Sequence, residues 1–335
     1  MSDRPNESGK RSVALVYYSF SSFVRQDYEI LSNHFDVRRV RYSSLKDVVS
    51  ILEAVLRSDV TFSWFAGGHA FLAVLFSKIL GKKSIVVVGG YDVAYVPQMD
   101  YGLFTEGWHK KAMTKFALRH ADRVLVVDPS LKDDAKRNAG ISGENIEYLP
   151  TGYDHLKFKS CGEKEDIAMT VCVADSWSRI KIKGVDTFVK AAMRMPDIKF
   201  LVVGLRGESL DMIQKIAPSN IELIGPVSQE ELISYYQKAK VYCQLSMREG
   251  LPNALCEAML CECTPVGTEC CGITSAIGDC GFYVPYGEAD ATAEAIRKAL
   301  SSPDVGKRAR KRIIGLFALS RRENGLEQIL NAVGD

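Results

Sequence analysis

Two glutamates, Glu249 and Glu257, carry the most informative chemistry in the sequence. Seven residues separate them within Met247–Met259, which reads MREGLPNALCEAM. Glu249 lies on a Gly/Pro loop, and the good helix formers around Glu257 predict a helix that begins beside Glu249. The N-terminus of such a helix offers N–H donors to a phosphate, while the two carboxylates can accept hydrogen bonds from hydroxyl groups. A nucleotide sugar has both kinds of group.

Three cations precede a glycine earlier in the same half of the chain. Arg179, Lys181 and Lys183 lie just before Gly184, after a predicted strand. Taken alone, such a run is typical of a solvated basic loop. Ligands of parallel sheets bind at the carboxyl ends of strands, however, and the glutamates occupy the matching place of the same domain. We therefore expect the cations to neutralise a diphosphate, with Lys183 in direct contact.

Strands and helices alternate along the whole chain. Near-continuous apolar strands separated by helices indicate parallel sheets covered on both faces. The predicted strands are Ser12–Tyr18, Val37–Val40, Val60–Trp64, Ser84–Val88 and Arg123–Val127, then Ile167–Ala174, Lys199–Gly204, Ile221–Ile224, Val241–Leu245 and Thr264–Gly267.

The segment Glu147–Lys159 resembles a linker, with Pro150, Gly152 and two lysines. We thus predict two doubly wound α/β domains that face each other across a cleft. Their bounds are 1–150 and 151–314.

Composition narrows the class of protein. The 335 residues are 47% hydrophobic and 25% charged, which is ordinary for a globular protein, and the net charge of +2 gives no reason to expect a nucleic-acid partner. Met1–Ser12 lacks the apolar core of a signal peptide, and no run of eighteen apolar residues occurs. We expect a cytoplasmic protein.

The basic segment Lys307–Phe317 either contacts anionic lipid at the inner membrane face or belongs to a terminal helix whose charges face water.

Nine cysteines raise the question of a metal site. The group Cys261, Cys263, Cys270 and Cys271 could hold zinc or an iron–sulfur cluster, but the nine include no paired C-x-x-C spacing. Cysteine also behaves as a small apolar residue, and these positions fall on a helix end and the strand after it. We favour buried, reduced thiols and predict no metal and no cofactor.

The second half resembles the donor domain of the glycosyl transferase group 1 enzymes, family 4 of the retaining glycosyltransferases with the GT-B fold. The resemblance covers Ile167 to about Leu300. Besides the two glutamates, it is carried by the motifs Lys183–Asp186, Val202–Gly204, Leu223–Leu232 and Gly281–Pro285. It implies two Rossmann-like domains, of which residues 151–314 bind the donor and residues 1–150 the acceptor. It also suggests that a C-terminal helix at about 315–335 packs back on the first domain.

The resemblance also implies roles for individual residues. Glu249 would contact the donor sugar, Glu257 the ribose, and Lys183 with Arg179 the diphosphate. The family usually places its arginine five or six residues before the lysine, whereas Arg179 lies four before Lys183, so Lys181 could share or take this role. The remaining donor-side residues are Gly184, Val227 beside the base, and Gly250, Leu251, Pro252 and Asn253 facing the phosphates.

The first half matches the family less well. After its first strand it has Ser19–Val24 where a Gly-rich loop is frequent, so Ser22 and Phe23 become acceptor-side candidates. Asp92, after Gly89 and Gly90, is a candidate for orienting the acceptor hydroxyl, or else a turn-forming residue. His109 is a further acceptor-side candidate, with a helix cap or a surface position as the alternative.

The expected activity is sugar transfer from a nucleotide-diphosphate sugar to a glycan or lipid-linked acceptor. No Asp-x-Asp motif occurs, so cations and a helix N-terminus should replace a divalent metal ion. The resemblance implies retention by front-face attack, in which the leaving phosphate helps to accept the acceptor proton. Two alternatives remain open on the same scaffold: a noncatalytic nucleotide-sugar binding protein and a sugar-nucleotide epimerase.

Overall fold

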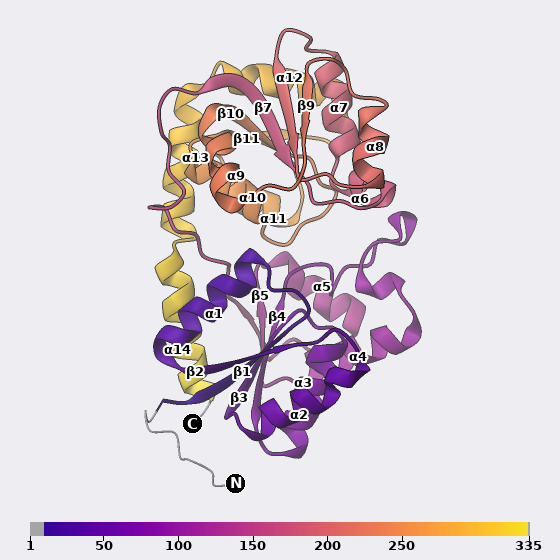
Figure 1. The fold of residues 1–335 in the computed structure, drawn as a ribbon, viewed down its shortest axis with the longest axis vertical. Coiled ribbons are helices and arrows are strands. Elements are labelled where there is room, and N and C mark those ends of the chain that lie inside the picture. Colours follow the sequence, from indigo (N-terminus) through magenta and orange to yellow (C-terminus); the bar gives the residue numbers. More distant parts are fainter. Residues whose placement is uncertain (1–9, 334–335) are drawn as a thin grey trace. The chain divides into compact units, whose positions relative to one another are not determined.

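The chain folds into two compact units, each built on one sheet (Figure 1). The computed structural model describes residues 10–333, so most of the polar segment Met1–Ser12 lies outside it. Residues 10–151 and 320–333 make up the first unit, and residues 152–319 the second. Within this part of the chain, no helix combines the length and apolar content needed to span a lipid bilayer.

The first unit contains a six-stranded parallel sheet in the order β2-β1-β3-β4-β5-β6. Strands β1, β3 and β4 are almost wholly buried, as their continuous apolar runs predict. The strands are β1 (Ser12–Tyr17), β2 (Asp36–Arg41), β3 (Val60–Trp64), β4 (Lys83–Val88), β5 (Arg123–Val126) and β6 (Ile146–Tyr148). The helices are α1 (Ser22–His34), α2 (Val48–Leu56), α3 (Gly68–Ile79), α4 (Trp108–His120), α5 (Ser130–Ala139) and the C-terminal α14 (Leu319–Val333).

The second unit repeats this architecture, with the strand order β12-β11-β10-β7-β8-β9 and parallel pairing throughout. Its strands are β7 (Glu165–Val171), β8 (Lys199–Val203), β9 (Ile221–Ile224), β10 (Ala239–Gln244), β11 (Thr264–Thr268) and β12 (Phe282–Val284). Its helices are α6 (Trp177–Ile182), α7 (Val185–Met193), α8 (Glu208–Gln214), α9 (Gln229–Lys238), α10 (Asn253–Leu260), α11 (Cys271–Ile277), α12 (Ala289–Leu300) and α13 (Pro303–Leu316). The predicted pair of doubly wound parallel-sheet domains is confirmed.

Two local predictions differ from the structure. The cationic segment after β7, predicted as a loop, contains the short helix α6, which begins after the extended residue Ser176. The predicted linker overlaps strand β6, which pairs with β5 along the edge of the first sheet. Both elements are short, and tertiary neighbours rather than strong local patterns support them.

Helix α14 completes the core of the first unit. Its Leu326 and Leu330 are fully buried, and the buried Arg322 forms a two-pronged ion pair with Asp27 of α1, at 3.0 Å from Nε to Oδ1 and 2.6 Å from Nη2 to Oδ2. Asp27 also accepts a hydrogen bond from the indole of Trp64 at 2.8 Å. Every charge in this cluster therefore has a partner, as burial requires.

Candidate functional site

The loop between β10 and α10 is held between two close glycine contacts. Gly184 has φ +68°, and a Cβ on it would lie 2.1 Å from the carbonyl oxygen of Leu245. On the other side, a Cβ on Gly272 would lie 1.6 Å from the carbonyl oxygen of Gly250. Only glycine permits such approaches. The basic segment and the start of α11 therefore both pack directly on this loop.

Lys183 and Glu249 meet at the carboxyl end of the second sheet. Lys183 Nζ lies 2.6 Å from Glu249 Oε1, and the two side chains are 30% and 12% exposed. The same oxygen accepts hydrogen bonds from Gln244 Nε2 at 2.9 Å and from Ser246 Oγ at 2.7 Å. One carboxylate oxygen of Glu249 thus receives three donors. The structure brings together the two residues that the sequence placed in this site.

Gln244 and Ser246 were missed by the sequence analysis. They belong to a run in which alternate residues point to opposite faces of the sheet. Val241, Cys243 and Leu245 enter the hydrophobic core, so the intervening Gln244 and Ser246 lie on the other face. Polar residues at every second position of an otherwise apolar strand were the available signal.

Glu257 lies about one turn into α10, as predicted, and its side chain is buried. The helix begins at Asn253, with Pro252 as its N-cap, and no side chain caps it. Because proline has no N–H, Pro252 cannot serve as one of the predicted donors to a phosphate. Burial raises the pKa of Glu257 to about 7, opposed by the Tyr236 hydroxyl, the charge of Lys157 and a hydrogen bond from Gln229. The Tyr236 hydroxyl lies 3.3 Å from Glu257 Oε2.

The two other predicted cations lie on α6 with different surroundings. Arg179 Nε is 3.4 Å from Asp175 Oδ1, and both side chains are exposed. Lys181 Nζ lies 6.0 Å from the centre of the Trp177 ring. Burial raises the pKa of Cys172, which follows β7, to about 11, while the charges of Lys183 and Arg179 lower it and that of Glu249 raises it.

Val227 lies between β9 and α9 and is partly buried. The residue after it, Ser228, caps α9 by accepting from Glu231 N at 3.2 Å, while Glu231 Oε2 accepts from Ser228 N at 2.8 Å. This capping box fixes the path of the chain after β9 and hence the position of Val227.

Asp92 is enclosed in the first unit. It is 1% exposed, and its two oxygens accept backbone hydrogen bonds from Gly90 N at 2.9 Å and Ala66 N at 3.0 Å. Burial raises the pKa of its carboxyl group, and the backbone donors oppose this effect. The carboxylate thereby ties the segments after β3 and β4 together. The hydrogen bond from Gly90 fits the turn-forming alternative.

The remaining acceptor-side candidates occupy helix starts. Ser22 is exposed at the first position of α1, and the ring of Phe23 packs 4.6 Å from that of Trp64. His109 is exposed at the second position of α4, with its ring 6.1 Å from that of Trp108. Phe23 has a packing role in the described structure, and His109 has the surface position given as its alternative.

The cysteine group is divided between two environments. Cys261 and Cys263 are buried, and Cys263 Sγ donates to the carbonyl oxygen of Tyr236 at 3.1 Å. Cys270 and Cys271 are partly exposed at the start of α11. Across residues 10–333, no three side chains of His, Cys, Asp or Glu come together as metal ligands.

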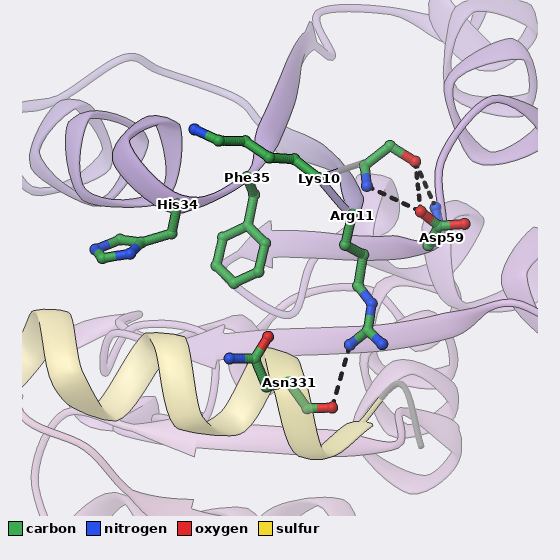
Figure 2. A pocket seen from close by; sticks show the side chains of 7 residues that line it. Lys10, Arg11, His34, Phe35, Asp59 and Asn331 are labelled. Atoms are coloured by element: carbon green, nitrogen blue, oxygen red, sulfur yellow. Dashed lines mark hydrogen bonds between the residues drawn. The ribbon is translucent and has the colours of Figure 1, made fainter. Parts of the chain in front are cut away.

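A hollow in the first unit lies at the amino ends of strands β1 and β3 (Figure 2). Asp59 accepts from Ser12 N at 2.9 Å and Ser12 Oγ at 2.8 Å, and Arg11 Nη1 donates to the carbonyl oxygens of Leu330 and Asn331. These bonds join the start of β1 to the approach to β3 and to the end of α14. The polar groups of this hollow hold the fold together, so we place the candidate site at the loop around Glu249. The hollow is lined by Lys10, Arg11, Ser12, His34, Phe35, Asp59 and Asn331.

Comparison with known proteins identifies the domain that contains this loop. Residues 169–302 match the family model of the glycosyl transferases group 1. The chain is 24% identical over 242 residues to alpha-galactosylglucosyldiacylglycerol synthase of Streptococcus pneumoniae, an alignment that covers 67% of this chain and 64% of the synthase. The chain thus spans slightly less than two thirds of that relative.

Solved structures agree with the fold. Sucrose-phosphate synthase from Thermosynechococcus elongatus has a TM-score of 0.77 at 18% identity, covering 97% of this chain and 99% of that one. Anabaena HepE in complex with UDP-glucose has a TM-score of 0.79 at 13% identity, covering 96% and 100%. The fold is that of the GT-B glycosyltransferases. The residues around Glu249 lie within residues 169–302, the part of the chain that matches the glycosyl transferases group 1 model.

Proposed function

We propose that the protein is a retaining, metal-independent glycosyltransferase that moves a sugar from a nucleotide-diphosphate sugar to a hydroxyl group of a glycan or glycolipid. The observation that carries this proposal is the convergence of Lys183, Gln244 and Ser246 on Glu249, beside the uncapped start of α10. The pneumococcal relative is named as a glycolipid synthase, and the HepE structure contains UDP-glucose, which supports both substrate classes.

Each part of the donor has a partner of suitable chemistry in this proposal. The diphosphate would be neutralised by Lys183 and Arg179 and by the N-terminal end of α10, where Gly250, Leu251 and Asn253 can offer backbone N–H groups. Glu257 would accept hydrogen bonds from the ribose and Glu249 from the sugar.

Val227 and Arg179 have further roles at the nucleotide end of the proposed site. Val227, partly buried after β9, would lie against the base. We assign the arginine role to Arg179 rather than Lys181 because Arg179 lies one helical turn before Lys183, whose backbone N–H donates to the Arg179 carbonyl oxygen at 3.1 Å, and residues four apart lie on the same face of a helix.

The reaction would proceed on one face of the sugar ring. The bond between the anomeric carbon and the phosphate oxygen breaks while the acceptor oxygen bonds to the same carbon from the same side. The acceptor proton passes to the leaving phosphate oxygen, and Lys183 with the helix dipole stabilises the charge that develops there. Glu249 would orient the sugar rather than attack it, because three donors already bind its Oε1.

The first experiment is a thermal-shift screen with UDP, GDP and their common sugars, since a ligand of the folded state raises its stability. The best donor is then incubated with glycan and glycolipid acceptors, and the anomeric configuration of the product is read by NMR with and without a chelator. An inverted product would refute retention, and activity lost with the chelator and restored by Mg²⁺ would refute metal independence. Binding without turnover would support the noncatalytic alternative, and an epimerised donor the epimerase.

A lipid-linked acceptor would imply a cytoplasmic enzyme with peripheral contact at the inner membrane face. In the basic helix α13, Ile313 is buried, and the exposed large apolar side chain is the single residue Leu316 at the end of the helix. Arg310 and Arg312 donate to backbone carbonyls of their own unit, at 2.8 Å to Phe158 and 2.8 Å to Ala276. Contact through α13 would therefore be electrostatic, and liposome flotation at low and high salt tests it.

A further inference from the structure

A buried polar stripe runs along β10 toward Glu249. The Tyr242 hydroxyl donates to Gln244 Oε1 at 3.2 Å, and Gln244 Nε2 donates to Ser246 Oγ at 2.9 Å and Glu249 Oε1 at 2.9 Å. Tyr242 and Ser246 are 0% exposed and Gln244 is 5% exposed. Burying this many polar groups is unfavourable unless each is hydrogen-bonded. The stripe satisfies its members and ends at the carboxylate.

The hydrogen bonds determine the orientation of the Gln244 amide. A carboxylate only accepts, so the amide nitrogen must face Glu249 and the amide oxygen must face the Tyr242 hydroxyl. Ser246 is held as well, because its own carbonyl oxygen accepts from Thr268 Oγ1 of β11. Both donors to Glu249 are therefore fixed by their own neighbours in the sheet.

We propose that Gln244, together with Ser246, is a positioning residue that fixes the Glu249 carboxylate independently of Lys183. This rests on the proposed function. A bound diphosphate attracts the Lys183 ammonium, which weakens its contact with Glu249 Oε1. The two neutral donors keep that oxygen in place. Among the described residues, no hydrogen bond to Glu249 Oε2 is present, so this oxygen is the one left to accept from a sugar hydroxyl.

Gln244→Leu tests the proposal, because leucine has a similar volume and cannot donate. With UDP-glucose as the probe, we expect kcat/KM to fall about 10- to 100-fold, since a misplaced substrate-orienting group costs about that much. The Kd of UDP should change less than about twofold, because UDP lacks the sugar. Ser246→Ala should likewise lower kcat/KM for UDP-glucose more than the affinity for UDP, but by a smaller factor. Ser246→Thr, which retains the hydroxyl, should restore activity.

Gln244→Glu adds a test based on charge. It keeps the shape of glutamine but places a second carboxyl group beside Glu249 Oε1. Two neighbouring carboxylates disfavour double ionisation, so one must stay protonated for the hydrogen bond to persist. The activity of this variant relative to wild type should therefore rise as the pH is lowered from 8 to 6. A purely structural defect would give the same ratio at every pH.

Thr170→Val is the matched control. Thr170 on the adjacent β7 donates to the carbonyl oxygen of Cys243 at 2.9 Å and is buried in the same sheet, with no hydrogen bond to Glu249. Its loss should lower the melting temperature while leaving the ratio of UDP-glucose kcat/KM to UDP affinity unchanged.

The outcomes separate this proposal from the proposed function. If Gln244→Leu changes the affinity for UDP and the kcat/KM for UDP-glucose by the same factor, as we expect for Thr170→Val, then Gln244 has only a structural role and the proposal is wrong. If the wild type uses another donor, that donor and its nucleotide replace the UDP pair. If the wild type turns over no nucleotide-sugar donor, the proposed function fails. Crystal structures of the unliganded wild type and of Gln244→Leu then show whether Gln244 positions the Glu249 carboxylate. An unmoved Glu249 carboxylate in the variant would overturn it.

Discussion

Replacing Glu257 with glutamine should stabilise the second unit at neutral pH and have little effect near pH 4.5. Burial raises the carboxyl pKa from 4.5 to about 7. Between these values the folded chain holds a proton that the unfolded chain has lost, so stability falls as the pH rises and the loss is complete above about pH 7. At about 1.4 kcal/mol per pKa unit, the raised pKa of Glu257 lowers the free energy of unfolding by about 3 kcal/mol above pH 7. Glutamine does not titrate, and its oxygen can still accept from Tyr236.

The assay is urea unfolding of the full chain at pH values from 4.5 to 8, with hydrogen exchange of the α10 peptide reporting on the second unit. The stability of Glu257→Gln relative to wild type should grow by about 3 kcal/mol across this range. Glu163→Gln, at an exposed position of the same unit, is the control and should show no such growth. A difference that stays constant with pH would refute the reasoning. Under the proposed function, the variant should also bind UDP about 10-fold more weakly at pH 8, where Glu257 is ionised, because hydrogen bonds to a charged acceptor are stronger than those to an amide.

Three further substitutions have defined outcomes. Lys183→Ala should lower turnover of the donor by about 10²- to 10³-fold, and a rate within a few fold of wild type would contradict the front-face mechanism. Gly184→Ala should abolish activity and lower the melting temperature far more than Gly207→Ala, because a Cβ at position 184 meets a carbonyl oxygen at 2.1 Å whereas position 207 opens on empty space at a similar positive φ. Arg322→Leu should destabilise the first unit by about 3–5 kcal/mol in urea unfolding, since it leaves Asp27 as a buried, unpaired charge, and Asp27→Leu in the same chain should recover part of that loss.

The fold was predictable because apolar runs of strand length recur between amphipathic helices. The three-residue edge strands and the cationic helix α6 were harder to predict. Strands β6 and β12 each have three residues at the edge of a sheet, and α6 has six residues, two of them cations. Such short segments form because neighbouring elements supply their partners, and those partners are distant in sequence.

The candidate site was predictable only where chemistry and local pattern coincide. Lys183 and Glu249 stood out because charged residues beside glycines mark the ends of strands. The raised pKa of Glu257 depends on burial that only the folded packing around α10 shows. The roles of Asp92 and Gln244 depend on which backbone and side-chain groups surround them, and those contacts are not encoded in spacing alone.

The return of the chain to its first unit sets an order for folding during synthesis. The buried Asp27 receives its ionic partner from α14, after the ribosome has translated the whole second unit. At typical elongation rates, those intervening residues take roughly ten to thirty seconds. The second unit, which is continuous in sequence, can complete its core first. Until α14 is synthesised, the N-terminal unit lacks the helix that covers part of its core. It is therefore the part of the nascent protein most exposed to chaperones and proteases.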